Sequence, residues 1–470
     1  MSTVTEAALL TSREITTGEE LGSVPLATPG SVRSAARRAA AAAPAWAATP
    51  AAERAAILSR AADLLLERAQ EAQDLLVREG GSITGKAFYE VHAAAAELRH
   101  AAELATAPEP AHGPGSDPGR ESEVRRLPLG LVGVIVPWNF PLLLGMRSVA
   151  PALALGNTVL LKPDPHTPLS GGRLFAEVLA GAGLPEGVLE VVYGDAEAGA
   201  ALVEAPGVAM VSFTGSTEVG RQIGATAGRL LKRVVLELGG QNAFVVLPDA
   251  DIEAAASAGS WGSFLHQGQI CMAARRHLVH QDAYENYTEA LARHAAALRI
   301  GDPYRSDAQI GPVIDHGQLT RIASAVEDAV AQGARLVTGG RVQGRYFPPT
   351  VLADVTPKMS IFHTEVFGPV ATLTSFADEA EAVELANTSD YGLTAAVYTS
   401  DADRGRALAA RLRCGVVHVG DQTVNHDPRL PFGGVGASGN SSGFGGQAAR
   451  DAFTRWHTLT TSTPARSYPF

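Results

Sequence analysis

Residues 268–272 read Gly-Gln-Ile-Cys-Met, and they follow the segment Glu237-Leu238-Gly239-Gly240 with 34 positions between Glu237 and Cys271 (271 − 237). The chain has only two cysteines. A cysteine in a glycine-containing segment with an acid upstream predicts a thiol nucleophile served by a carboxylate base. The competing interpretation is a small buried hydrophobe, and Cys414, in Leu-Arg-Cys-Gly, fits that interpretation well.

Three further segments share the chain with this pair: Pro137-Trp138-Asn139-Phe140-Pro141, Phe213-Thr214-Gly215-Ser216-Thr217 and Glu365-Val366-Phe367-Gly368-Pro369. In this order and spacing the set resembles the NAD(P)-dependent aldehyde dehydrogenase superfamily, from about residue 20 to the C-terminus. The resemblance implies an α/β fold with a Rossmann-like cofactor domain, an α/β catalytic domain and a small oligomerisation element. It also implies a homodimer or homotetramer.

Composition limits the function classes. The 470 residues are 46% hydrophobic with a formal net charge of −11, which is too long a chain for one compact core, so two or three domains are expected. The acidic balance argues against a nucleic-acid or anionic-membrane partner. No run of roughly 18 or more apolar residues predicts a membrane span. Two cysteines cannot make a disulfide framework, which favours a reducing cytoplasm, and no metal site is expected.

The pattern of elements changes along the chain. Residues 31–105 are predicted to be helical, and residues 107–122 are too rich in Pro and Gly for a regular element. Helices are then expected between short apolar strands, which predicts βαβ units and a parallel sheet. The strands are expected at 131–136, 158–161, 188–192, 209–213 and 234–236, and the helices at 170–182, 196–204, 217–227 and 282–298.

These patterns, with the resemblance, divide the chain into three parts. Residues 1–108 and 129–239 are predicted to form the NAD(P)-binding domain, and residues 240–450 the catalytic domain. The oligomerisation element is predicted at 109–128 and 451–470, with an edge strand at 455–461.

Aldehyde oxidation to an acid needs a nucleophile, oxyanion donors, a hydride acceptor and a base that hydrolyses the thioester. Cys271 is the predicted nucleophile, and its backbone N–H with the Asn139 amide are the predicted oxyanion donors. Glu237 is the predicted general base. Without the resemblance, Asn139 would pass as part of a strand-ending turn and Glu237 as a solvated carboxylate.

The usual Gly-x-Gly-x-x-Gly fingerprint is absent after the early strands. A segment of small residues instead follows an apolar strand and opens a helix, where a pyrophosphate can bind. The resemblance implies that Ser216 contacts phosphate, Lys162 reaches the adenosine ribose, Glu365 binds the nicotinamide ribose and Phe367 packs beside the nicotinamide. The full set of predicted cofactor residues is Val136, Trp138, Lys162, Gly215, Ser216, Thr217, Gly220, Glu365 and Phe367.

One departure from the family pattern bears on cofactor choice. Many NAD-specific members have Lys-Pro-Ser-Glu where this chain has Lys162-Pro163-Asp164-Pro165. Pro165 removes a carboxylate that would repel a 2′-phosphate, and Lys162 and His166 are cations available to one. NAD is the expected cofactor, with NADP open as an alternative.

A group of departures resembles the benzaldehyde and vanillin dehydrogenase branch. They are Lys-Pro-Asp-Pro, His266–Met272, Asp421–Asn425, Gly436 in the glycine-rich loop, and the terminal Tyr-Pro-Phe. The predicted substrate is therefore an aromatic aldehyde. The predicted pocket residues are Phe140, Leu144, Leu265, Ile270 and Met272 as an apolar slot, with Arg147 as either an attractor of a ring substituent or a structural ion pair.

Three alternatives stay open at this point. The substrate can be an aliphatic aldehyde or a semialdehyde; the acyl group can pass to coenzyme A, against which Glu237 argues; or the fold can serve a non-catalytic binding role.

Overall fold

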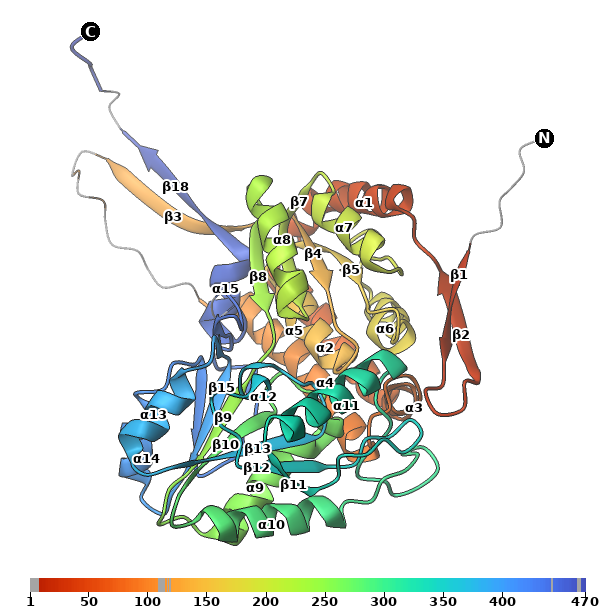
Figure 1. Ribbon diagram of the computed structural model, residues 1–470. Helices are drawn as coiled ribbons and strands as arrows, with labels where there is room; N and C mark the ends of the chain where they lie inside the picture. Colours follow the sequence, from red (N-terminus) through yellow and green to blue (C-terminus); the bar gives the residue numbers. More distant parts are fainter. Residues whose placement is uncertain (1–7, 109–114, 116, 118–119, 441–442, 463–465) are drawn as a thin grey trace.

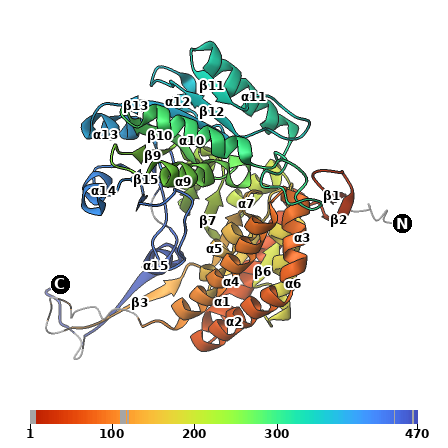
Figure 2. The same ribbon diagram turned by 90° about the horizontal axis from the view of Figure 1, so that it is seen from below.

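The computed structural model describes residues 8–108, 115, 117, 120–440, 443–462 and 466–470. In this part of the chain two large, mostly parallel sheets, each covered by helices on both faces, form two adjoining bodies (Figure 1). Figure 2 shows helices α1–α4 gathered at one end of the molecule and α10 and α11 at the other.

The first described sheet has five strands in the order β6-β5-β4-β7-β8 and is parallel throughout. Its strands confirm the five predicted from apolar runs. They are Leu131–Ile135 (β4), Thr158–Lys162 (β5), Leu189–Val191 (β6), Val208–Thr214 (β7) and Arg233–Glu237 (β8).

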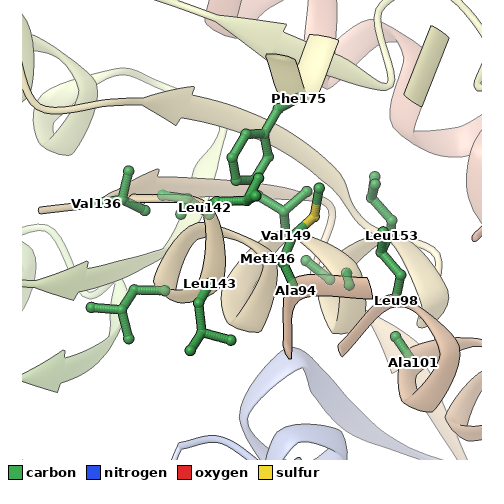
Figure 3. Packing of buried hydrophobic residues seen from close by; sticks show 14 of the residues in the cluster. Ala94, Leu98, Ala101, Val136, Leu142, Leu143, Met146, Val149, Leu153 and Phe175 are labelled. Carbon is green, nitrogen blue, oxygen red and sulfur yellow. The ribbon is translucent and has the colours of Figure 1, made fainter. Parts of the chain in front are cut away.

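Both faces of this sheet are buried, which is why its strands are almost continuously apolar. Val132 and Val134 pack into one hydrophobic cluster, and the alternate residues Leu131 and Ile135 pack into another. Helix α5 lies at the centre of the first cluster, where Met146, Val149 and their neighbours meet α4 and Phe175 (Figure 3).

Helices cover the sheet as the sequence predicts for 31–105, 196–204 and 217–227. One predicted helix differs from the structure. The segment expected as a helix over 170–182 begins with a π-helical turn, Leu169–Arg173 (η1). The buried Glu79 carboxylate accepts the Leu169 and Ser170 N–H groups, and two glycines weaken the α-helix there. The helices are Pro29–Ala48 (α1), Ala51–Glu67 (α2), Ala69–Gly80 (α3), Thr84–Thr106 (α4), Pro141–Ala154 (α5), Leu174–Gly181 (α6), Ala196–Glu204 (α7) and Thr217–Arg229 (α8).

The second described sheet has seven strands in the order β11-β12-β13-β10-β9-β15-β16, and only the β11–β12 pair is antiparallel. Its strands are Asn242–Val246 (β9), Ala274–His280 (β10), Arg335–Thr338 (β11), Thr350–Ala353 (β12), Val370–Phe376 (β13), Thr394–Tyr398 (β15) and Val416–Val419 (β16). The helical segments are Ile252–Phe264 (α9), Leu265–Gly268 (η2), Tyr284–Ala297 (α10), His316–Ala331 (α11), Ser360–His363 (α12), Glu379–Asn387 (α13) and Ala402–Ala409 (α14).

Short ribbons complete the fold. The predicted edge strand forms an antiparallel ribbon that projects from the body, while most of the loop predicted at 107–122 lies outside the described residues. The pairs are Leu9–Arg13 (β1) with Glu20–Pro25 (β2), Glu121–Pro128 (β3) with Thr454–Thr461 (β18), and Tyr391–Gly392 (β14) with Val435–Gly436 (β17), and Gly446–Phe453 (α15) precedes β18.

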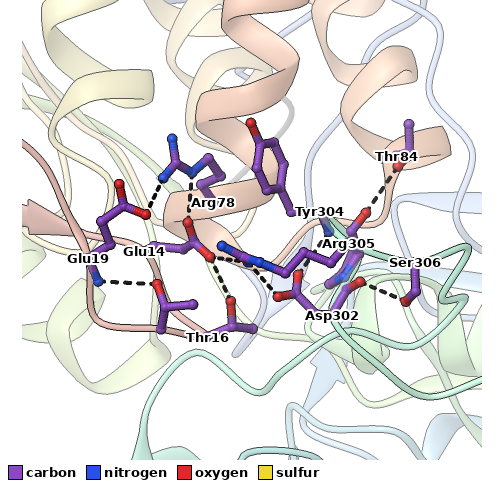
Figure 4. A network of polar contacts seen from close by, with 11 residues as sticks. Glu14, Thr16, Glu19, Arg78, Thr84, Asp302, Tyr304, Arg305 and Ser306 are labelled. Atoms are coloured by element: carbon purple, nitrogen blue, oxygen red, sulfur yellow. Dashed lines mark hydrogen bonds and ion pairs between the residues drawn. The ribbon is translucent and has the colours of Figure 1, made fainter.

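A polar network joins the two bodies (Figure 4). The buried Glu14 carboxylate, just after β1, pairs with Arg78 of α3 at 2.8 Å and with Arg305 from the second body. Arg305 also pairs with Asp302 at 2.6 Å. Because Glu14 pairs with a cation from each body, this network links the two bodies.

None of the helices in the described residues combines the length and apolar character needed to cross a membrane.

Candidate active site

Cys271 lies in the connection between η2 and β10, at the junction of the two bodies. The backbone before it is unusual, because His266 and Gln267 have φ of 50° and 55°. Arg275 holds this loop by donating to the Gly268 and Gly368 carbonyls. After it, the Asn242 amide donates to the Cys271 carbonyl at 2.8 Å. The nucleophile candidate thus stands on a backbone fixed from both sides.

The thiol is half-buried and unpaired with any other cysteine. Desolvation, together with the nearby Glu365 and Glu237 carboxylates, raises the pKa of Cys271 to about 12, and Arg147 opposes the rise. The free thiol is therefore the resting form at neutral pH, and reaction requires its proton to move to a base.

Asn139 lies in the turn between β4 and α5, where it is 4% exposed. Its Nδ2 donates to the Gln269 carbonyl at 2.9 Å, so the side chain reaches the nucleophile loop. The sequence predicts the Asn139 amide and the Cys271 N–H as the oxyanion donors, and the structure brings Asn139 and Cys271 together in the lining of one cavity.

A buried ion pair on α4 holds this turn. Lys86 pairs with Glu90, and its Nζ donates to the Asn139 carbonyl at 2.6 Å. Glu90 accepts the N–H groups of Leu142 and Leu143 at 2.9 and 3.2 Å, at the start of α5. Both carboxylate and ammonium are satisfied, as burial of charge requires, and α4 thereby holds the backbone of the turn that carries Asn139.

Glu237 is the last residue of β8, with 4% of its surface exposed. Neither carboxylate oxygen accepts a hydrogen bond from the described residues. Burial raises its pKa well above the ordinary value, with Arg147 as the opposing charge. A buried carboxylate with a raised pKa is a stronger base than an exposed one, which is the property a general base needs.

A cavity of about 300 Å³ has Cys271 and Asn139 in its lining. All six residues predicted for the substrate pocket line it: Phe140, Leu144, Arg147, Leu265, Ile270 and Met272. Most of the remaining wall is also apolar or aromatic, from Leu143, Tyr89, Trp261, Val424 and Phe432. Such a lining suits a flat apolar group better than a charged or strongly hydrated one.

One wall of this cavity is charged. Arg147 is 4% exposed and has its Nε 3.8 Å from Glu97, which also pairs with His426 at 2.7 Å. The guanidinium lies 4.6 Å from the centre of the Phe432 ring. Arg147 thus has Glu97 as a neighbouring opposite charge, without a hydrogen bond from its Nε among the described residues, and it also lines the cavity.

A second cavity, of about 550 Å³, lies at the carboxyl ends of β4, β5 and β7, the usual nucleotide position in a parallel sheet. It is lined by five of the predicted cofactor residues: Val136, Trp138, Lys162, Gly215 and Ser216. Ser216 caps α8, its Oγ accepting the Val219 N–H at 3.4 Å. The lining fits a dinucleotide, since a helix N-terminus for phosphate adjoins an apolar slot between α7 and α8.

The other four predicted cofactor residues lie outside this cavity. Thr217 donates to the Ala437 carbonyl at 2.9 Å. Gly220 allows α8 to approach β8, because an added Cβ would lie 2.4 Å from Leu238. Glu365 accepts the Gly240 N–H at 3.0 Å, and Phe367 packs edge-on against Trp138 with centroids 5.7 Å apart. The last two thus face the cleft from the second body.

Comparison with known proteins identifies the family to which this chain belongs. The model of the aldehyde dehydrogenase family matches residues 5–459. The chain belongs to the aldehyde dehydrogenase family. It is 50% identical over 425 residues to benzaldehyde dehydrogenase [NAD(+)] of Pseudomonas putida, covering 90% of this chain and 87% of the relative. It is 49% identical over 462 residues to vanillin dehydrogenase of an Amycolatopsis species, covering 97% and 94%.

Among solved structures, a salicylaldehyde dehydrogenase from Pseudomonas putida G7 complexed with salicylaldehyde matches with a TM-score of 0.95. It is 34% identical and covers 98% of this chain and 96% of that one. The predicted family and the predicted α/β fold are both confirmed.

Some lining residues of this aldehyde dehydrogenase were not found from the sequence. Lys86 and Tyr89 lie on α4, more than 180 positions before Cys271 (271 − 89 = 182), and carry no local motif. Val424 and Asn425 lie in the segment 421–425 that resembled the aromatic branch, and Phe432 opens the glycine-rich loop, so those two signals pointed at the cavity. Trp261 precedes Leu265 by one helical turn, a spacing that would have identified it.

Proposed function

We propose that this aldehyde dehydrogenase oxidises aromatic aldehydes of the benzaldehyde and vanillin type to carboxylic acids with NAD(P)⁺. The cavity with aromatic side chains, Cys271 and Asn139 in its lining is the observation that carries the substrate assignment. The names of the two relatives support it.

The proposed chemistry starts at sulfur. The Cys271 proton passes to a base, and the thiolate attacks the carbonyl carbon to give a thiohemiacetal whose oxyanion accepts hydrogen bonds from the Asn139 amide and the Cys271 N–H. Bound NAD(P)⁺ supplies the hydride acceptor. Loss of hydride from the former carbonyl carbon leaves a thioester on Cys271. Glu237 then takes a proton from water, the hydroxide equivalent attacks the thioester, and the thiolate leaves with the acid as product.

Removing the oxyanion donor tests one part of this scheme. Asn139→Ala is expected to lower kcat on the order of 10²- to 10³-fold, because the developing negative charge loses one donor. Initial rates with benzaldehyde measure it, with Asn139→Asp as the isosteric comparison that puts a repelling charge at the same place. A kcat within about twofold of wild type for Asn139→Ala would remove Asn139 from the mechanism.

Selectivity tests the substrate. We expect kcat/KM for benzaldehyde and vanillin to exceed that for acetaldehyde, hexanal and succinic semialdehyde. A ring that fills the apolar slot buries more surface than a two-carbon chain, and each missing methylene-sized contact costs roughly 10-fold or more. Acetaldehyde turnover equal to or better than that of benzaldehyde would discard the aromatic assignment. Formation of acyl-CoA on adding coenzyme A would instead favour the acyl-transfer alternative.

Three further proposals concern the organisation of the protein. We propose the domain division given above, with the β3–β18 ribbon as the oligomerisation element of a homodimer or homotetramer. The ribbon projects from the body and exposes Leu459. A cytoplasmic location is supported by the free state of both cysteines.

A further inference from the structure

The lining of the cofactor cavity carries more negative than positive charge, and its polar end lies at Lys162. Among the described residues that line it, Lys162 is the one cation, and Asp164, Asp195 and Glu204 are carboxylates. The family resemblance implies that Pro165 stands where many NAD-specific members have a glutamate that accepts the ribose 2′-hydroxyl. The structure therefore poses a specific question: which group, if any, takes over that role.

Two of these carboxylates surround Lys162. Lys162 ends β5 and is 6% exposed, with its Nζ donating to the Pro163 carbonyl at 3.2 Å. Desolvation lowers the pKa of Lys162, and Asp164 and Asp195 both act in the opposite direction, so both carboxylates are electrostatic neighbours of the ammonium.

Each of the two carboxylates has one oxygen engaged and one available. Asp195 caps α7, its Oδ1 accepting the Glu197 N–H at 2.9 Å. Asp164 Oδ1 accepts the His166 N–H at 2.9 Å. No described residue donates to either Oδ2, so these oxygens can accept from a ligand hydroxyl.

His166 is not free to neutralise a phosphate. Its Nδ1 lies 2.8 Å from Asp164 and its Nε2 lies 3.4 Å from Asp315. It also lies outside the cavity lining. A 2′-phosphate at this end would meet Lys162 alone among cations, with two carboxylates beside it.

The adenosine half of a dinucleotide belongs at this end. With the pyrophosphate at Ser216, the adenine fits the slot between α7 and α8, lined by Val203, Val219 and Ile223. The ribose between adenine and phosphate then lies beside Lys162 and the start of α7. The side chain of Lys162 passes Gly199 of α7, where an added Cβ would lie at an ordinary contact distance of 3.7 Å.

We propose that Asp195 and Asp164 replace the missing glutamate: their carboxylates accept hydrogen bonds from the adenosine ribose hydroxyls and repel a 2′-phosphate, so that the enzyme selects NAD⁺ over NADP⁺. This inference rests on the proposed function, because it presumes a dinucleotide in the cavity. It reverses the tolerance of NADP that the loss of the glutamate alone would suggest.

Calorimetric titration of the full chain with NAD⁺ and NADP⁺ tests the proposal without turnover. We expect wild type to bind NADP⁺ more weakly than NAD⁺ by on the order of tenfold to a hundredfold, the size of like-charge discrimination at a partly solvated site. Asp195→Asn, Asp164→Asn and their double variant keep the shape and the capping oxygen. Each single variant should bind NADP⁺ more tightly, and the double variant should bring the two dissociation constants close to equality.

Glu204→Gln is the matched control. It removes a carboxylate of the same cavity at about 13 Å from Asp195 along α7, beside Lys232, whose charge already interacts with it. Its NADP⁺-to-NAD⁺ ratio should match wild type. A wild-type ratio near one, or a double variant that keeps the wild-type ratio, would overturn the inference while leaving the proposed oxidation intact. Failure of both dinucleotides to bind wild type would contradict the proposed function itself.

Discussion

Cys271→Ala is expected to abolish aldehyde oxidation, with kcat/KM falling on the order of 10⁴-fold or more, because no thiohemiacetal can form without the sulfur. The side chains of Arg275 and Asn242 hold the loop around Cys271 by donating to the Gly268 and Cys271 carbonyls, and the substitution leaves these hydrogen bonds in place. The variant should therefore fold and bind NAD⁺ with the wild-type dissociation constant. Initial rates of nicotinamide reduction and a parallel calorimetric titration measure the two quantities.

Cys414→Ala is the matched control. Cys414 lies after α14, and its Sγ donates to the Val416 carbonyl at 3.4 Å, away from both Glu237 and Asn139. Burial raises its pKa to about 11, and, unlike Cys271, it lines neither the substrate cavity nor the cofactor cavity. Full activity is expected. Substantial turnover by Cys271→Ala would show that Cys271 is not the nucleophile. Loss of turnover in Cys414→Ala alone would show the same.

Glu237→Gln is the second change with a large expected effect. The substitution keeps the shape of a buried side chain that has no hydrogen-bond partner among the described residues, but it cannot take a proton from water. Steady-state kcat should fall about 10²- to 10⁴-fold. Because acylation can still proceed, one equivalent of reduced nicotinamide per active site should appear as a rapid burst before the slow phase.

The pH dependence follows from the same burial. A carboxyl whose pKa is raised well above its ordinary value is protonated, and inactive as a base, at pH values below that raised pKa. Wild-type kcat should therefore fall as the pH decreases through that value, and the same limb should be missing from the Glu237→Gln profile. If Glu237→Gln shows no burst and keeps the wild-type pH profile, Glu237 does not act in thioester hydrolysis.

Much of the cofactor sheet could be predicted because its strands are buried on both faces. Runs such as Val132–Val134 have to be apolar on every residue, and that pattern is visible without a structure. The π-helical turn at Leu169 was not predictable in the same way. The start of the turn is held by Glu79, 90 positions earlier, whose carboxylate accepts the Leu169 and Ser170 N–H groups, and a contact over that distance leaves no local sequence signal.

In the active site, too, local motifs could be predicted and tertiary contacts could not. Asn139, Glu237 and Cys271 lie in short motifs at strand ends or loops, and the family resemblance carried by those motifs identified them as candidates. The Lys86–Glu90 pair that fixes the Asn139 turn comes from a helix whose sequence looks like any amphipathic surface. Its contribution arises only when α4 packs on α5, which is a tertiary contact. The position of His166 also needed the structure, because its availability as a cation depends on Asp315, far away in the sequence.

The covalent step can be observed directly. Glu237→Gln, mixed with NAD⁺ and benzaldehyde and rapidly quenched in acid, is digested and its peptides are weighed by mass spectrometry. The peptide that contains Cys271 should carry one benzoyl group in place of its thiol hydrogen, in an amount equal to the reduced nicotinamide formed in the burst. Reduced nicotinamide and benzoate accompanied by an unmodified Cys271 peptide, or a benzoyl group on Cys414, would contradict a thioester mechanism at Cys271.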